Sequence, residues 1–142
     1  MEDFRRVFME ALDKIKVIYT VLNEEDNLIH IGYTTEIGTN LDVFADFDEN
    51  SKGEQMPSCK FVIPRLVVAP EDKSINVLLA LNDLNETYRF VKFSLNANNY
   101  VTLTFDSFFL GGDAVTECMF ALQTLLKVAN EAYPVVMRAI YS

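Results

Sequence analysis

The sequence is poor in the side chains that most often build metal sites and catalytic centres. Its 142 residues include one histidine, His30, and two cysteines, Cys59 and Cys118. The cysteines lie far apart and form no CxxC pair, so their spacing indicates neither a zinc site nor a disulfide framework. Unpaired thiols that pack as small hydrophobic side chains fit a reducing compartment, and we therefore expect a cytoplasmic protein.

Long apolar runs, a basic excess and linkers are missing as well. The longest apolar stretches are shorter than the ~18–20 residues that span a bilayer, and the first residues, MEDFRR, lack the apolar run that is typical of a signal peptide. Twelve basic and 21 acidic residues give a net charge of −9. This charge repels phosphate backbones and anionic lipid, so it disfavours nucleic-acid and membrane partners. No repeat, low-complexity tract or linker divides the chain, and we expect one domain over residues 1–142.

Half of the residues are hydrophobic, and their spacing changes along the chain between the period of a helix and that of a strand. The expected helices span about residues 2–18, 70–85 and 113–133. The expected strands span about residues 28–34, 41–50, 59–68, 88–95 and 100–107. This α-β-β-β-α-β-β-α order, with short turns between neighbouring strands, predicts an α+β fold with an antiparallel five-stranded sheet. Helices should cover one face of the sheet. The face that should meet water carries Asp42, Asp46, Lys60, Lys92, Thr102 and Thr104.

Three prolines and one aspartate predict where these elements begin, bend or end. Pro64 cannot donate a ladder hydrogen bond, so its strand is either bent there or lies at a sheet edge. Pro70 suits the first position of the second helix, and Asp113 can cap the third helix by accepting from free N–H groups. Pro134 should kink or end that helix.

One pattern resembles a metal site but is incomplete. Asp46, Asp48 and Asn50 have the oxygen spacing that opens a calcium-binding loop. Ser51 stands where the sharp turn needs glycine, and Pro57 stands where the bidentate glutamate should be. A solvated strand face is the better interpretation, so we predict no metal.

The remaining candidates for chemistry lack their partners. His30 has no HxxxH partner, and a single histidine on a strand is usually an ordinary sheet residue. Cys59 and Cys118 fall on apolar faces, and the sequence shows neither the base nor the oxyanion cradle that a nucleophile needs. Gly111-Gly112 is followed by no GxxxxGK[ST] or GxGxxG motif and is not a phosphate loop. The sequence therefore predicts no catalytic apparatus and no cofactor.

Two asparagines mark a change of period within LNDLNETYRFVKF, residues 81–93. Asn82 and Asn85 share one side of the last helical turn. Asparagine tolerates left-handed geometry and can satisfy backbone groups at a helix end. We expect the two residues to hold a structural corner, with Asn85 as the cap; the alternative is a ligand-binding role. The expected apolar face of this helix consists of Ile75, Leu78, Leu79, Leu81 and Leu84.

The same joint carries a family resemblance. The stretches LLALNDLNETYRFVKFSLNANNYVTLTFD and GGDAVTECMFALQTLLKVANEAYPVV resemble the YbjN-type domain of bacterial proteins, which are labelled as sensory transduction regulators. The order of elements is similar to that of type III secretion chaperones, small acidic proteins that dimerise and hold extended segments of client proteins. The resemblance implies a non-enzymatic protein-binding module that forms a homodimer.

Our first hypothesis is therefore an intracellular binding or regulatory module that contacts another protein through apolar patches. The candidate contact residues are Phe44, Phe61 and Val62 on the strands. The competing hypothesis is a small-molecule sensor or enzyme with a pocket between sheet and helices, which would use carboxylates and His30. A third alternative is a structural subunit whose apolar face serves only homodimer formation.

Overall fold

The computed structural model describes residues 3–23, 28–109 and 113–142, so Gly111-Gly112 lies outside the described residues. The helices are α1 (Phe4–Lys14), α2 (Ser74–Thr87) and α3 (Ala114–Tyr141), with a short 3-10 turn, η1 (Glu71–Lys73), before α2. The strands are β1 (Tyr19–Asn23), β2 (Leu28–Thr34), β3 (Asn40–Glu49), β4 (Gln55–Val68), β5 (Val91–Leu95) and β6 (Tyr100–Phe108).

The strands form one antiparallel sheet of six strands in the order β1-β2-β3-β4-β6-β5. The expected α+β class and antiparallel sheet are confirmed, but the expected number of five strands is wrong because it omits β1. The first helix ends at Lys14, and Lys16 has a left-handed backbone with φ of 61°. This residue reverses the chain, so that Tyr19 begins a strand and pairs with Ile31 of β2.

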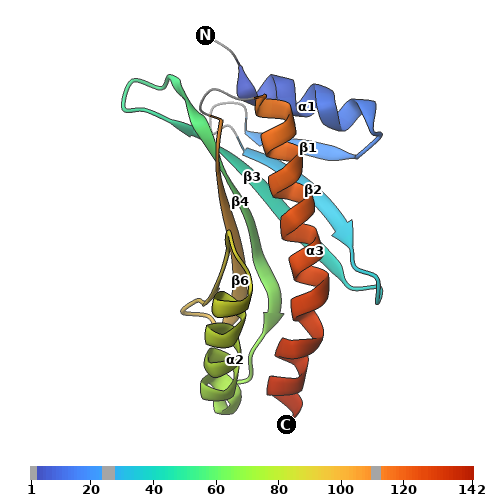
Figure 1. Ribbon diagram of the computed structural model, residues 1–142, viewed down its shortest axis with the longest axis vertical. Coiled ribbons are helices and arrows are strands. Elements are labelled where there is room, and N and C mark those ends of the chain that lie inside the picture. The colour runs from blue at the N-terminus through green and yellow to red at the C-terminus, as the bar shows by residue number, and fades with distance from the viewer. Residues whose placement is uncertain (1–2, 24–27, 110–112) are drawn as a thin grey trace.

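Helices cover one face of this sheet, as Figure 1 shows: α3 lies along its length, α1 crosses near one end and α2 lies beside the other. The strand residues that face the helices are buried and include Ile29, Ile31, Val43, Ala45, Phe61, Ile63 and Leu103. On the opposite face Asp42, Asp46, Lys60 and Lys92 are exposed, and Thr102 and Thr104 are half-buried. This pattern confirms the prediction that one face of the sheet meets water.

The strand with Pro64 is central, because β4 lies between β3 and β6. The pairing of β4 with β6 is irregular between Ile63 and Val67, where the missing proline donor cannot extend the ladder. Thr102 on β6 donates from its hydroxyl to the Pro64 carbonyl over 3.0 Å. The strand is therefore irregular at Pro64, and the alternative of an edge strand is wrong.

The third helix begins as predicted, and of the two alternatives at Pro134 the end of the helix is wrong. Asp113 is its N-cap, and its carboxylate accepts from the Val115 N–H over 3.0 Å. Pro134 lies inside the helix, which runs on to Tyr141. Val136 and Ile140 are buried beyond the proline, so their packing offsets the lost backbone hydrogen bond and the helix continues.

The joint between α2 and β5 is held by one asparagine. The Asn85 side-chain oxygen accepts from the Phe93 N–H over 2.7 Å, and its amide donates to the Phe93 carbonyl over 3.0 Å. The helix continues to Thr87, and its C-cap is Tyr88, whose N–H donates to the Leu84 carbonyl. The expectation that Asn85 is the cap is therefore wrong. Asn85 thus joins helix to strand from within the last turn. Asn82 is exposed.

Candidate protein-binding surfaces

The face of the sheet without helices carries one row of side chains across all six strands. The strand register places Thr20, His30, Phe44, Val62, Thr104 and Lys92 side by side in that order. Phe44 and Val62 are direct neighbours in the middle of this row, and both are half-buried. The Phe44 ring lies 5.2 Å from the His30 ring. Two of the three candidate contact residues thus form a small apolar patch at the centre of this face.

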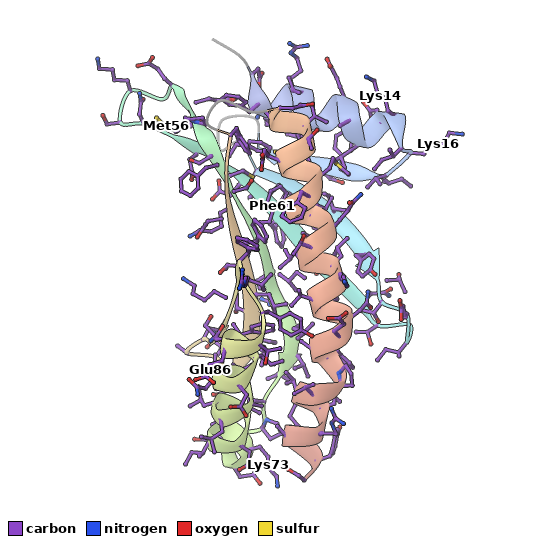
Figure 2. The ribbon with its side chains drawn as sticks, viewed as in Figure 1. Lys14, Lys16, Met56, Phe61, Lys73 and Glu86 are labelled. Atoms are coloured by element: carbon purple, nitrogen blue, oxygen red, sulfur yellow. The ribbon has the colours of Figure 1, made fainter. Side chains whose placement is uncertain are left out.

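The third candidate contact residue, Phe61, lies on the opposite face. Its side chain is 0% exposed and lies between the sheet and α3, as Figure 2 shows. Its ring centroid is 5.6 Å from that of Phe8 in an edge-on arrangement. Successive residues of a strand point to opposite faces, so Phe61 and its neighbour Val62 cannot share one surface. Phe61 is a core residue, and its assignment as a contact residue is wrong.

His30 stands on the outer face of the sheet with one acidic partner. Its Nε2 lies 2.8 Å from Asp42 Oδ1, and the Asp42 side chain is largely exposed. The described residues contain no group of three or more His, Cys, Asp or Glu side chains that could hold a metal ion. A surface pair of this kind is typical of a solvated strand face.

Both thiols are buried in the core, as the sequence predicts. Burial raises the pKa of the Cys118 thiol to about 12, and the neighbouring Glu117 carboxylate adds to this effect. Burial likewise raises the pKa of Cys59 well above its usual range. A catalytic cysteine needs the opposite shift, because the thiolate is the nucleophile.

The outer side of α2 carries a second apolar surface, which the sequence interpretation placed in the core. The buried residues of the helix are Val77, Leu81 and Leu84. The exposed fractions of Ile75, Leu78 and Leu79 are 74%, 49% and 63%. These three residues follow helical spacing and form one stripe, which we call the α2 ridge. The expected apolar face is therefore wrong in part, since only Leu81 and Leu84 of its five members point inward.

A surface cavity of about 490 Å³ lies between the β2–β3 turn and α3. Its lining consists of Tyr33, Glu36, Gln123, Leu126, Lys127, Asn130 and Glu131. The Asn130 amide is already engaged, because it accepts from the Glu36 N–H and donates to the Tyr33 hydroxyl. The cavity has an exposed rim, and the layer between sheet and helices holds buried apolar side chains instead. This arrangement differs from the pocket that the small-molecule hypothesis requires.

Across the described parts of the chain, no helix combines the length and the apolar character needed to cross a membrane.

Comparisons with known proteins agree with this fold. A family model described as "Putative bacterial sensory transduction regulator", the YbjN family, matches residues 9–137. The crystal structure of E. coli YbjN, described as a putative transcription regulator, has a TM-score of 0.62 at 12% identity and covers 92% of this chain and 91% of that chain. A chain of the heterodimeric ExoU-SpcU complex from the type III secretion system of Pseudomonas aeruginosa has a TM-score of 0.56 at 15% identity and covers 89% of this chain and 94% of that chain. No curated protein matches the sequence. The expected family and the likeness to a type III secretion chaperone are confirmed.

Proposed function

The chain belongs to the YbjN family, and from that premise we propose that it is a non-enzymatic, cytoplasmic protein-binding module that acts as a homodimer. The observation that carries the proposal is the α2 ridge, since a helix packed on one side keeps three large aliphatic side chains in water on the other. Exposed apolar stripes on otherwise well-packed domains mark contacts with other proteins. The neighbour with a known assembly is part of a heterodimeric complex, which supports a protein partner.

The occupant proposed for the α2 ridge is a second copy of the same chain. Lys73 and Glu86 lie at opposite ends of the helix (Figure 2) and are almost equally far along the sequence from Leu79. Within one chain Lys73 Nζ donates to the Ser142 carbonyl over 2.7 Å. In an antiparallel pair of α2 helices with the two-fold axis near Leu79, Lys73 of each copy exchanges or shares this contact with Glu86 of the other. A two-fold interface is self-complementary in this way, and the opposite charges favour this register over a parallel one.

The dimer is tested by placing a charge on the ridge. Leu79→Asp buries a carboxylate in each copy at the centre of the interface, so we expect its dimer dissociation constant to rise at least about a hundredfold. Size-exclusion chromatography with light scattering should show a dimer for the wild type and a monomer for the variant. The matched control is Ile37→Asp, because Ile37 is 68% exposed, similar to Leu79 at 63%, but lies in a turn away from α2. A monomeric wild type, or a dimer in the Leu79→Asp variant, would overturn this assignment.

For the partner protein, the surface proposed is the Phe44–Val62 patch at the centre of the outer sheet face. Phe44→Asp places a charge in the patch without touching the core, so we expect it to abolish capture of a partner and leave the melting temperature within a few degrees of the wild type. The measurement is affinity capture with quantitative mass spectrometry, again with Ile37→Asp as the control. The proposal requires a protein that the wild type and the control retain and the Phe44 variant loses.

Two outcomes of that measurement favour the competing hypotheses. A dimer whose captured proteins do not depend on Phe44 would indicate a structural subunit. A small molecule that raises the melting temperature of a chain that captures no protein would indicate a sensor, and the cavity beside Asn130 would then be its site.

A further inference from the structure

Three phenylalanines from separate parts of the chain form an aromatic cluster at the end of β5. Phe90 precedes β5, Phe105 lies on β6 and Phe120 lies on α3. Their ring centroids are 5.8 Å, 6.3 Å and 6.4 Å apart. Phe105 is buried, whereas Phe90 and Phe120 are 67% and 52% exposed. The cluster therefore presents two large aromatic faces to the solvent. An aromatic side chain that only supports the core would be buried instead.

The Phe90 ring is held in the cluster by a strained backbone conformation. Its φ is 72°, in the left-handed region that a bulky side chain rarely adopts. Such a conformation persists only where the surrounding structure enforces it, and it is concentrated at functional sites. The Phe90 side chain is mostly exposed, so the small apolar area that it buries contributes little free energy to offset the backbone strain.

An open strand edge lies beside the cluster. The pairing of β5 with β6 ends at Val91 and Phe105, while the pairing of β4 with β6 continues to Phe108. On the β5 side, residues 106–108 of β6 thus have no partner among the strands of the described chain. An edge of this kind offers backbone N–H and C=O groups to an added strand.

A cavity of about 480 Å³ follows this edge. It is lined by four consecutive residues of β6, Phe105–Phe108, together with Phe90, Glu117 and Phe120. Because alternate strand residues face opposite sides, a cavity that touches all four must run along the edge of the strand. An extended segment fits this shape, since its backbone would meet the edge and its alternate side chains would meet the two sides.

The charges of the cavity are of one sign. Its charged lining residues are Asp106 and Glu117. Lys60 on β4 lies opposite Asp106. The ion pairs of the described residues nevertheless include neither Asp106 nor Glu117. Both carboxylates are therefore available to cations brought by a partner.

We propose that this cavity binds an extended peptide segment of a partner protein in which large apolar residues alternate with lysine or arginine. The inference rests on the proposed protein-binding function and gives the chemistry of the segment that is bound. The apolar residues pack on the rings of Phe90, Phe105 and Phe120, and the basic residues meet Asp106 and Glu117. The backbone of the segment extends the ladder at residues 106–108.

The probe for this site is a short fluorescein-labelled peptide of alternating Phe and Lys, measured by fluorescence anisotropy with the full chain. We expect Phe120→Ala to weaken binding about tenfold or more, and replacement of each Lys by Glu in the peptide to abolish it. Glu117→Gln should weaken binding, while Glu36→Gln, the same change at an exposed glutamate of the β2–β3 turn, should leave it unchanged. The comparison of Glu117→Gln with Glu36→Gln separates binding at this site from general attraction of a basic peptide to an acidic protein.

A further variant separates binding from folding. Phe90→Asn removes the ring and places at this position a residue that tolerates the left-handed backbone. We expect a melting temperature equal to or above that of the wild type, together with weaker peptide binding. Unchanged binding by Phe90→Asn and Phe120→Ala, or equal binding of the Phe/Glu peptide, would overturn the inference. If these variants keep the peptide affinity of the wild type while Phe44-dependent capture persists, this site is refuted and the protein-binding function stands.

Discussion

Replacing Phe61 by alanine should lower the free energy of unfolding by about 3–5 kcal/mol, the range for truncating a buried phenylalanine. The side chain is fully buried at the centre of β4 and packs edge-on against Phe8. Phe8 in turn lies 5.7 Å from Phe47, so the cavity left behind would be bounded by rings that cannot close it without moving α1. Equilibrium unfolding in urea, followed by circular dichroism, gives the change directly.

The control for Phe61→Ala is Phe44→Ala on the neighbouring strand. Phe44 is half-buried on the outer face of the sheet, so its truncation should cost about 1 kcal/mol or less. In the partner-capture measurement we expect the opposite ranking, because the Phe44→Ala variant stays folded and yet loses the partner. A loss below about 1 kcal/mol for Phe61→Ala would contradict its place in the core. The comparison also guards against mistaking an unfolded variant for a binding variant.

The two faces of the sheet could be predicted because strand residues alternate. Asp42, Asp46, Lys60 and Lys92 were assigned to the solvent face from this period alone, and they are exposed. The same period contained the signal that Phe61 and Val62 face opposite ways. Cys59 and Ile63, two residues before and after Phe61, are buried, so the side chains that share the period of Phe61 belong to the inner face and Val62 belongs to the outer one.

The features that could not be predicted depend on tertiary packing. Apolar residues surround α2, so its sequence does not tell which side meets the sheet; only the packing of Val77, Leu81 and Leu84 decides this. Strand β1 was hidden because Ile15 and Tyr19 continue the spacing of α1, and the pairing with β2 overrides that local pattern. The aromatic cluster draws on residues distant in sequence, and no local pattern indicates the backbone of Phe90.

Native Cys118 should react with a disulfide reagent at least about tenfold more slowly than an ordinary thiol at pH 8, because the loss of thiolate outweighs the higher nucleophilicity of a more basic thiolate. Its pKa is raised to about 12 from an ordinary value of 9.0, and each unit of that shift removes about tenfold of the thiolate that attacks the reagent. Cys59 should be unreactive for the same reason, since burial raises its pKa well above the usual range. The measurement is the rate of colour formation with an aromatic disulfide, with and without denaturant.

An added exposed thiol provides the matched reference. Ser94→Cys lies on β5 with its side chain in water and should react at the rate of a free cysteine, while the two native thiols remain silent. Fast reaction of either native cysteine would show that its surroundings are open or that its pKa is low, and would reopen the question of a nucleophile.

The same shift predicts how stability depends on pH. Below the ordinary thiol pKa both folded and unfolded chains carry the proton, so the cysteines contribute no pH dependence there. Above pH 9 the unfolded thiols ionise while the folded ones do not until about pH 12 for Cys118. The unfolded state then binds fewer protons, and stability must fall as the pH rises through this window. Cys118→Ala should make that part of the urea-unfolding profile less steep, while Cys59 and Tyr88, whose pKa values are also raised, should maintain the remaining slope.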